Sequence, residues 1–531
     1  MTCPQFLRGA ALGLVAGMLA CAAHAADSSV LRKGNGPEVE SLDPHKVEGV
    51  SAANVLRDLY EGLVSEGPDA DLRPGAAESW TVSEDLQTYT FRLRENARWS
   101  NGDPVVADDF VAGMRRSVDP ATGSHYAQML APIENAEAVI EGKLSPQRLG
   151  VIAVDPHTLV IKLKGPTTYL LGMLVHASTY PIHRASLARF GAQFAQPGKL
   201  VSNGAYRLQE RVVQSHITLV RNPNYWDDAN TRIDTVQYLN TEDLNSEFKR
   251  FRAGELDWTY EIPAAQAQWI RANMSREYQV NTYLGVYYYG FNLSQPPFKD
   301  NPKLRRALTL TIDRKIICEK VLGMGEQPAD AWVPPGTAGH RTSRAQWSGW
   351  SREQSLAEAR RLYADAGYSA DRPARVELLY NTHENHKKVA TAIAAMWKQW
   401  LGVDVVLINQ EWKVYLQTRR LKSTTQVFRA GWIGDYNDAN SFLEIMHSTH
   451  GLNDTAYASA SYDSLLAKAA VEADPAQREQ WMHEAEAQLL EDLPVIPIYF
   501  YVTKRLVSPR VKGWRGNVMD HHPTRFLRLE G

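Results

Sequence analysis

The sequence predicts an α/β protein with more than one lobe, and three observations lead to this fold class. Between about residues 376 and 432, strand-like and helix-like patterns alternate. Segments near residues 90 and 160 instead have the character of β-ladder strands with turn-rich flanks. The chain has 531 residues, and single hydrophobic cores stop growing at about 250–300 residues. We therefore expect two or three domains.

The α/β unit begins with a short strand at residues 376–380, which are rich in β-favouring side chains. Apolar residues then recur at helical spacing over residues 387–401, and Gly402 suits the C-cap of that helix. Residues 403–408 resume as a strand, so the unit is βαβ, with parallel strands and a right-handed crossover. A second helix (about 411–421) and another strand (about 427–432) extend it into an open α/β lobe.

Other elements are expected on either side of this unit. Residues 88–93 and 158–163 are predicted strands of a β-ladder. A helix is predicted to start at Asp474, with proline at its first position, and to run to about residue 491, before an apolar strand at 495–502. No low-complexity linker is present, so we expect crossing strands rather than a flexible tether to join the lobes.

The N-terminus has the pattern of an export signal. Arg8 is the only charged residue among the first 25, and an uncharged run over residues 9–23 follows it. This run is shorter than the roughly 20 apolar residues of a membrane span, and it leads to an A-x-A site that ends at Ala25. Cleavage near Ala25 is favoured over lipid anchoring at Cys21, because Met18 stands where a lipobox usually has a branched apolar residue.

Cysteine content and charge exclude several classes of protein. Removal of the signal leaves Cys318 alone, so an internal disulfide is excluded. The net charge is −2, and no block of like charges indicates nucleic acid or an anionic membrane surface as a partner. The 14 tryptophans and 23 tyrosines offer broad apolar faces with polar tips, which suit the binding of varied ligands.

Catalytic and metal-binding motifs are missing from the sequence. It has no G-x-S-x-G, no P-loop and no dinucleotide fingerprint. His383 and His386 are three residues apart, one short of the zinc-protease spacing, and the run 520–522 (DHH) is interpreted as solvated rather than metal-binding. The acidic segment 66–71 is interpreted as a surface turn. We expect no enzyme activity, no metal and no cofactor.

Several long segments carry a family resemblance. They are 41–50 (SLDPHKVEGV), 91–110 (FRLRENARWSNGDPVVADDF), 202–206 (SNGAY), 221–227 (RNPNYWD) and 431–437 (GWIGDYN). In this order they resemble the periplasmic oligopeptide-binding proteins of peptide ABC transporters, in solute-binding family 5, and the resemblance covers essentially the whole mature chain.

This resemblance implies a two-lobed periplasmic binding protein fold of the cluster C type, with an extra domain. It places the protein in the periplasm as a monomer that binds short peptides and delivers them to the permease subunits of an inner-membrane ABC transporter. The expected parts are a signal peptide (1–25), a discontinuous lobe 1 (26–60, 186–286 and 503–531), an extra α+β domain (61–185) and lobe 2 (287–502).

The resemblance also implies how a peptide backbone and amine are read. Glu48 to Val50, at the end of an expected first cleft strand, and Gly431 to Ile433 supply strands that pair with the ligand as an added strand. Asp435, just beyond the second of these, meets the α-ammonium, in line with ligands lying beyond strand ends in open α/β sheets. A turn or N-cap aspartate is the alternative for Asp435.

The peptide carboxylate and side chains have further candidate partners. Arg419, Arg429 and His386 are the expected cations for the carboxylate, and a guanidinium matches that group with a planar fork. Because Arg420 is adjacent to Arg419, the match to the family pattern is open by one residue there. For each of the three candidates, the alternative role is a surface ion pair. Roomy, wet side-chain pockets are expected along Tyr126, Trp412 and Trp432.

Two departures from the family pattern bear on the ligand. Relatives of this subgroup can carry two cysteines where this chain has Gly285 and Ile433, so a local disulfide is lost without stranding a thiol. A lysine that meets longer peptides in relatives is replaced by Leu322, which leaves the preferred ligand length open and favours tripeptides or modified peptides. The alternatives to a general peptide receptor are a murein tripeptide receptor, a peptide-holding chaperone and a periplasmic hydrolase, the last lacking any nucleophile–base pattern.

Overall fold

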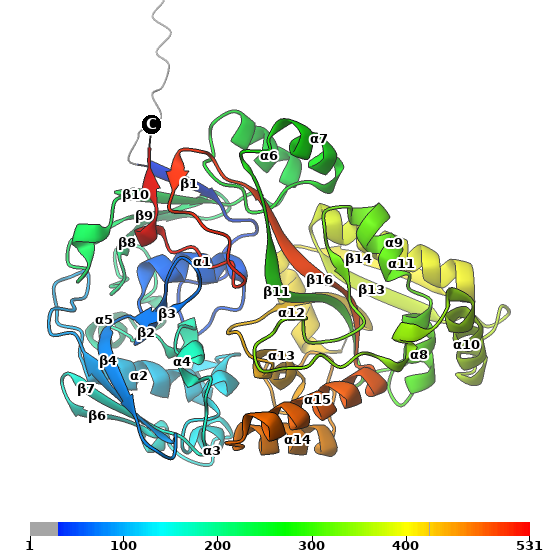
Figure 1. The fold of residues 1–531 in the computed structure, drawn as a ribbon, viewed down its shortest axis with the longest axis horizontal. Coiled ribbons are helices and arrows are strands. Elements are labelled where there is room, and N and C mark those ends of the chain that lie inside the picture. The colour runs from blue at the N-terminus through cyan, green and yellow to red at the C-terminus, as the bar shows by residue number, and fades with distance from the viewer. Residues whose placement is uncertain (1–29, 424, 531) are drawn as a thin grey trace, which may run out of the picture.

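The protein consists of two lobes that lie side by side, and two long strands run between them (Figure 1). The computed structural model describes residues 30–423 and 425–530. The predicted signal peptide lies outside these residues. The two strands are β11 (Tyr278–Phe291) and β16 (Val495–Leu506), which pair antiparallel from Tyr278↔Leu506 to Gly290↔Val495. They confirm that crossing strands, not a flexible tether, join the lobes.

The crossing strands belong to a six-stranded mixed sheet in the order β12-β16-β11-β15-β13-β14. Strand β13 is parallel to β14 and β15, whereas β11 is antiparallel to β15. The predicted βαβ unit is therefore confirmed, and Gly402 ends its helix with φ of 73°. The bounds are Gln327–Pro328 for β12, Arg375–Asn381 for β13, Glu384–Leu401 for α11, Asp404–Gln410 for β14, Trp412–Leu421 for α12 and Val427–Ile433 for β15.

Helices complete the second lobe around this sheet. The helix predicted to start at Asp474 is α15 (Pro475–Asp492), and the Asp474 carboxylate accepts a hydrogen bond from the amide of Ala476 at 3.1 Å. None of the helices in the described ranges is long and apolar enough to cross a membrane. The others are α8 (Pro302–Leu310), α9 (Arg314–Ile316), α10 (Arg352–Asp365), α13 (Asn440–Leu443) and α14 (Ala460–Ala470).

The first lobe contains a four-stranded sheet in the order β1-β10-β9-β8. Only the β1–β10 pair is parallel, and α1 packs near β8. The bounds are Val30–Gly34 for β1, Val50–Leu59 for α1, Tyr206–Val212 for β8, His216–Arg221 for β9, Thr235–Leu239 for β10, Leu244–Arg252 for α6 and Ala267–Asn273 for α7.

A second four-stranded sheet, β4-β5-β7-β6, lies in the same half of the molecule and is antiparallel throughout (Figure 1). It contains both predicted ladder strands, which pair with each other. The expected domain limits at 61 and 185 stay a prediction. The bounds are Ala77–Val82 for β4, Thr88–Leu93 for β5, Ala107–Val118 for α2, Ala136–Ile140 for α3, Val151–Asp155 for β6, Thr158–Lys162 for β7, Leu170–Met173 for α4 and Arg184–Phe190 for α5.

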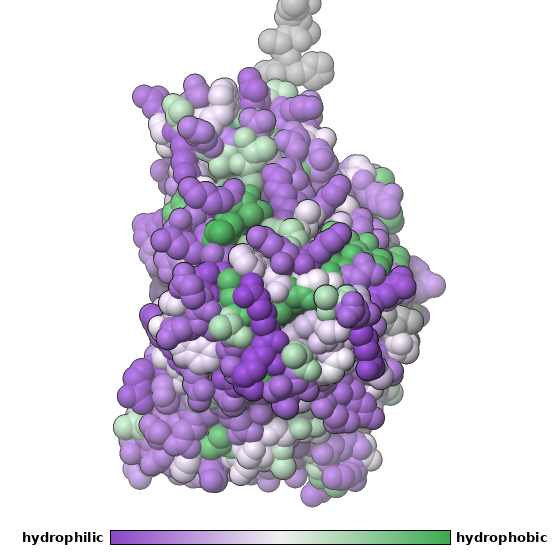
Figure 2. Space-filling view, turned by 90° about the vertical axis from the view of Figure 1, so that its right-hand side faces the viewer, coloured by the Kyte–Doolittle hydropathy of each residue, from purple (hydrophilic) through white to green (hydrophobic). Residues whose placement is uncertain are grey.

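Two short hairpins and a large apolar core complete the fold. The hairpins are β2 (Val64–Glu66) with β3 (Leu72–Pro74), and β17 (Val511–Lys512) with β18 (Arg528–Leu529). One core cluster extends through both lobes, and it includes the buried Cys318. On the face shown in Figure 2, hydrophobic residues surface in separate groups between hydrophilic ones.

The expected strand at residues 41–50 is wrong. The segment is irregular until Val50, which opens α1 after Gly49 as the N-cap. The reason is local, because the carboxylate of Glu40 accepts hydrogen bonds from the amides of Glu48 and Gly49, both at 2.7 Å. These amides are held by a side chain rather than by a neighbouring strand.

The expectation of a solvated run at residues 520–522 is also wrong. The side chains of Asp520, His521 and His522 are at most 9% exposed. Asp520 pairs with Arg505 and accepts from His522 Nε2 at 2.9 Å, while His521 pairs with Glu66. Glu66 is accordingly buried at the end of β2, whereas the rest of the segment 66–71 forms the expected turn, with Asp69 and Asp71 exposed. The C-terminal segment packs back onto the first lobe because these ion pairs compensate the buried charges.

Candidate ligand-binding site

A cavity of about 290 Å³ lies between the lobes. Its wall includes the N-terminal end of α1, the end of β15 with the turn that follows, and part of the crossing strand β16. Every site residue proposed from the sequence lines this cavity, although their roles remain a prediction. These residues are Glu48, Val50, Tyr126, His386, Trp412, Arg419, Arg429, Gly431, Trp432, Ile433 and Asp435.

Asp435 places a carboxylate in the cavity wall without a cationic partner at contact distance. Its Oδ1 lies 3.7 Å from His176 Nε2, and its Oδ2 is buried with no hydrogen-bond partner among the described residues. Burial raises the pKa of Asp435 to about 8, against the opposing influence of the Arg57 guanidinium and a hydrogen bond with Tyr126. Burial lowers the pKa of His176 to about 3, so its imidazole is neutral at pH 7. Such a carboxylate is suited to receive a cation from a ligand.

The three predicted carboxylate partners differ sharply in their environments. Arg419 forms a buried ion pair with Asp454. Burial, and then the Arg429 charge, lower the pKa of His386 well below its usual value, so this histidine is neutral. Arg429 belongs to none of the ion pairs among the described residues, and its contacts are with neutral groups. Arg429 is therefore the candidate whose charge is available to a ligand.

The surroundings of Arg429 hold its guanidinium in place without neutralising it. One terminal nitrogen donates to Tyr501 Oη at 2.7 Å and the other to Asn381 Oδ1 at 3.3 Å. The guanidinium also lies 4.6 Å from the centre of the Tyr287 ring. These contacts orient a planar donor fork toward the cavity at little cost in side-chain entropy when a ligand binds.

The edge of β15 is open beside the cavity. The amide of Gly434 donates to the carbonyl of Leu284 on β11 at 2.8 Å. Because residues of an antiparallel strand alternate in direction, the backbone groups of Gly431 and Ile433 point away from β11. Pairing with β13 on that other side stops at Phe428. An extended ligand can therefore hydrogen-bond to this edge as an added strand.

The opposite wall presents a helix start rather than the expected strand. The carbonyl of Glu48 and the amide of Val50 make no backbone hydrogen bond within the described ranges. The Glu48 carboxylate pairs with Arg420 of α12, and Lys413 lies 3.9 Å from Glu38. These two ion pairs join the α1 side of the cavity to α12, so Arg420 is engaged between the lobes.

Aromatic rings cover the part of the cavity near Asp435. Tyr126 stacks on Trp432 with ring centres 6.2 Å apart and lies 4.4 Å from the His176 ring. The Trp432 indole donates to the carbonyl of Ser441 at 2.6 Å, which fixes its position. Trp412 stacks on Tyr415 at the α12 wall. These rings offer apolar faces to the cavity, and the wet side-chain pockets expected along them stay a prediction.

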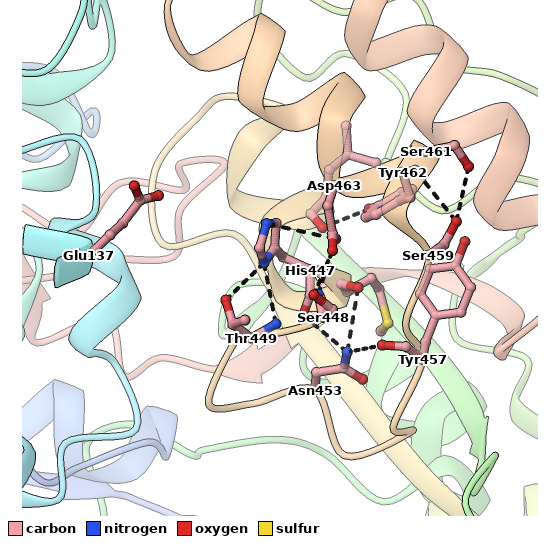
Figure 3. A network of polar contacts seen from close by, with 12 residues as sticks. Glu137, His447, Ser448, Thr449, Asn453, Tyr457, Ser459, Ser461, Tyr462 and Asp463 are labelled. Carbon is pink, nitrogen blue, oxygen red and sulfur yellow. Dashed lines mark hydrogen bonds and ion pairs between the residues drawn. The ribbon is translucent and has the colours of Figure 1, made fainter. Parts of the chain in front are cut away.

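The loop after α13 carries Leu452 into the cavity wall and is held by a polar network (Figure 3). Asn453 donates to the carbonyls of His447 and Tyr457 at 3.1 and 2.8 Å. Asp463 accepts from the amide of Ser448 at 3.1 Å. Figure 3 also shows Glu137 of α3 across from this network, with no contact drawn between them. The network therefore belongs to the second lobe and is structural.

Several lining residues escaped the sequence reasoning. Glu261 and Lys504 form an ion pair of 3.2 Å, and Glu261 also pairs with His383 at 3.2 Å. Arg57 and Tyr501 line the same space. None of these residues lies in a recognisable motif; they meet because separate segments converge.

The two departures from the family pattern have different outcomes. Gly285 and Ile433 are register partners on β11 and β15, so the positions implied for a disulfide do face each other. A Cβ on Gly285 would lie 2.5 Å from the Ile433 side chain, which fills the space. Leu322, by contrast, is 4% exposed in the apolar core and does not line the cavity. The inference about ligand length from Leu322 is therefore wrong.

A two-lobed fold with a ligand-sized cavity between the lobes defines a solute-binding protein. The chain matches the model of the bacterial extracellular solute-binding proteins, family 5 Middle, over residues 71–454. It is 43% identical to the periplasmic oligopeptide-binding protein OppA of Escherichia coli (strain K12), covering 98% of this chain and 97% of that protein. The chain belongs to solute-binding protein family 5.

Solved structures of two relatives show how the lobes are arranged. The complex of Haemophilus influenzae OppA with RPPGFSPFR and the Escherichia coli murein tripeptide binding protein MppA each match with a TM-score of 0.92 and 39% identity, covering 95% of this chain and 99% of theirs. An unliganded open form of MppA is 40% identical and covers 95% of this chain and 98% of its own. It matches with a TM-score of only 0.67. The lobes of this protein are therefore arranged as in the peptide complex rather than as in the open form.

Proposed function

We propose that this protein is the substrate-binding component of an ABC importer and captures short peptides between its lobes. The observation that carries the proposal is one cavity lined by two buried ionisable side chains that have no charged partner among the described residues. Asp435 supplies a carboxylate and Arg429 a guanidinium, and the open edge of β15 lies beside them. A peptide offers an ammonium, a carboxylate and a backbone ladder, which are the groups shared by all peptides.

In this proposal the ligand lies as an added strand along Gly431 to Ile433. Its ammonium meets Asp435, and its carboxylate meets Arg429. Side chains project into the aromatic pockets around Tyr126 and Trp412, where water adapts its hydrogen bonds to different ligands. Recognition of the shared groups combines useful affinity with low side-chain selectivity.

The cellular role follows from the same reasoning. The export signal sends the protein to the periplasm, and the relative OppA of Escherichia coli is periplasmic by name. There the protein acts as a monomer without catalysis, closes around a peptide by a hinge motion, and delivers it to the permease subunits in the inner membrane.

A murein tripeptide is the second candidate ligand. The solved murein tripeptide binding protein matches this chain as well as the OppA complex does. The cavity also contains Glu261 and Lys504, which would pair with the extra ammonium and carboxylate of a diamino-acid residue. A ligand of this kind carries more charges than an ordinary tripeptide, so the two candidates are chemically distinct.

Mass spectrometry of the ligands released from the purified protein under denaturing conditions tests the proposal. Mixed linear peptides with free amines support a general peptide receptor, and one γ-linked, diamino-acid peptide supports the murein candidate. A non-peptide ligand contradicts both. Incubation with a defined peptide provides the complementary test, because cleavage products would show a hydrolase, and binding of unfolded protein rather than short peptides would show a chaperone.

A further inference from the structure

Tyr169 reaches from the first lobe into the second. It precedes α4, which belongs to the half of the molecule that contains β4–β7 (Figure 1). Its ring stacks on that of Tyr436, with centres 5.5 Å apart and an interplanar angle of 5°. The guanidinium of Arg478, on α15, lies 4.7 Å from the centre of the same ring. Tyr169 is 8% exposed, so it is nearly enclosed by these two partners.

The two residues that enclose Tyr169 are held by the second lobe alone, and we name them the Tyr169 socket (Tyr436 and Arg478). Asp438 accepts two hydrogen bonds from Arg478, at 2.8 and 3.0 Å. Asn440 donates to Tyr436 Oη at 2.9 Å. Because these contacts do not involve Tyr169, the socket is expected to persist when the lobes separate.

The backbone around Tyr169 also approaches the second lobe closely. A Cβ on Gly172 of α4 would lie 3.2 Å from the Cβ of Tyr436. A Cβ on Gly165 would lie 2.7 Å from the side chain of Val471. Glycine at these two positions permits the approach. The contact is thus a fitted surface between the lobes rather than one isolated stack.

The socket is coupled in sequence to the cavity. Tyr436 directly follows Asp435, and Asp435 in turn is fixed by a hydrogen bond from its amide to Ser441 Oγ at 2.8 Å. Neither Tyr169 nor its socket lines the cavity. One short turn therefore holds the candidate ammonium partner on one side and the interlobe contact on the other.

We propose that Tyr169 is a latch that holds the lobes closed, and that it positions the Asp435 turn without touching the ligand. The inference rests on the proposed function for what the cavity binds. Insertion of Tyr169 into its socket stabilises the closed arrangement in both free and bound protein. Opening withdraws the ring from Tyr436 and Arg478, so the latch slows ligand release and enriches the closed form before a ligand arrives.

The test compares three variants of the full mature protein. Tyr169→Ala removes the stack and the cation–π contact, whereas Tyr169→Phe keeps both. Tyr368→Ala is the matched control, since Tyr368 stacks on Tyr363 at 5.4 Å within the second lobe alone. Each protein is unfolded, stripped of ligand and refolded. Its radius of gyration is measured by small-angle X-ray scattering, and its dissociation rate from a fluorescent tripeptide by stopped flow.

Tyr169→Ala is expected to enlarge the ligand-free protein and to raise the dissociation rate roughly tenfold. Tyr169→Phe and Tyr368→Ala are expected to behave like the wild type. A Tyr169→Ala protein with an unchanged radius and dissociation rate would overturn the latch. If the wild type binds no tripeptide, the proposed function fails, and the radius of the ligand-free proteins alone then decides for or against the latch.

Discussion

At the scale of single residues, the site depends on two ionisable side chains that the protein buries without a charged partner. Asp435 has an orphan oxygen in the cavity wall, and Arg429 is held only by neutral groups. Arg419, by contrast, is paired with Asp454, and Arg57 contacts Asn54 and His521. Burial of an unpaired charge costs free energy, and a ligand that supplies the missing partner recovers it.

The raised pKa of Asp435 predicts that peptide binding releases a proton. At pH 7 the carboxyl group is mainly protonated, because burial raises its pKa to about 8. A ligand ammonium stabilises the carboxylate and lowers that pKa, so the proton leaves on binding and affinity rises with pH up to about 8. Calorimetry at pH 7 in buffers of different ionisation enthalpy measures the release.

Asp435→Asn is the control for this proton. It should weaken peptide binding by roughly 2–5 kcal/mol, because the ammonium loses its buried partner, and should abolish the buffer dependence. Asp463→Asn, in the structural network of Figure 3, should leave both unchanged. A binding enthalpy that is the same in all buffers for the wild type would contradict the assignment of Asp435.

The two arginines predict different phenotypes. Arg429→Gln should weaken binding of free-acid peptides and leave C-terminally amidated peptides unaffected, because only the former present a carboxylate. Arg419→Gln should instead destabilise the fold by about 3–5 kcal/mol, since it strands the buried Asp454 charge. Calorimetry with both peptides and urea unfolding separate these effects. An equal loss for acid and amide in Arg429→Gln would exclude it as the carboxylate partner.

At the scale of elements, the open edge of β15 decides how a ligand can lie. A Cβ on Gly431 would lie 2.5 Å from Tyr501 Oη, so a larger residue there would displace the Tyr501 side chain that contacts Arg429. Its backbone groups and those of Ile433 face the side on which β13 no longer pairs with β15. The strand therefore offers the backbone groups of every second residue to a ligand. Selectivity for ligand side chains then depends on the neighbouring pockets alone.

This edge predicts that the ligand backbone contributes directly to affinity. N-methylation of one internal amide of a tripeptide should weaken binding by about 0.5–1.5 kcal/mol for each hydrogen bond lost. The affinity of the methylated and parent peptides is compared by calorimetry. If methylation leaves the affinity unchanged at each internal position tested, the ligand does not lie as an added strand.

The sequence reveals elements with strong local patterns but not those set by distant contacts. The unit around α11 was predictable because the apolar spacing and the C-cap residue Gly402 both indicate a helix that ends at residue 401. The helix begins at Glu384, however, rather than at residue 387. The segment 41–50 failed because the Glu40 side chain takes the amides that a strand would use. The burial of His521 could not be foreseen, since Glu66 is its partner 455 residues away.

For the site, the family resemblance indicated eleven residues that all line the cavity, but the sequence could not rank them. The sequence gives no reason to prefer Arg429 over Arg419 as the carboxylate partner. The structure does, because Asp454 pairs with Arg419 and makes its charge unavailable to a ligand. Leu322 was misplaced because its distance from the cavity is a property of the core packing. Glu261 and Lys504 were missed because nothing local brings them together.

At the scale of the whole molecule, function depends on the arrangement of two lobes about two strands. The closed arrangement brings Asp435 of one lobe against His176 of the other, and Glu48 against Arg420. It agrees with the structure of a peptide complex and differs from that of an open relative. Ligand capture, closure and the Tyr169 contact are thus parts of one equilibrium, and a ligand shifts it by binding the closed form better.

The central claim, that the closed cavity captures peptides through their free amine, is tested most directly by calorimetry with one peptide in two forms. The wild-type protein is titrated with a tripeptide and with its N-acetylated derivative after removal of any co-purified ligand. Acetylation removes the ammonium that pairs with Asp435, so we predict an affinity at least thirtyfold lower, or roughly 2 kcal/mol. Equal affinity for the two forms would contradict the account.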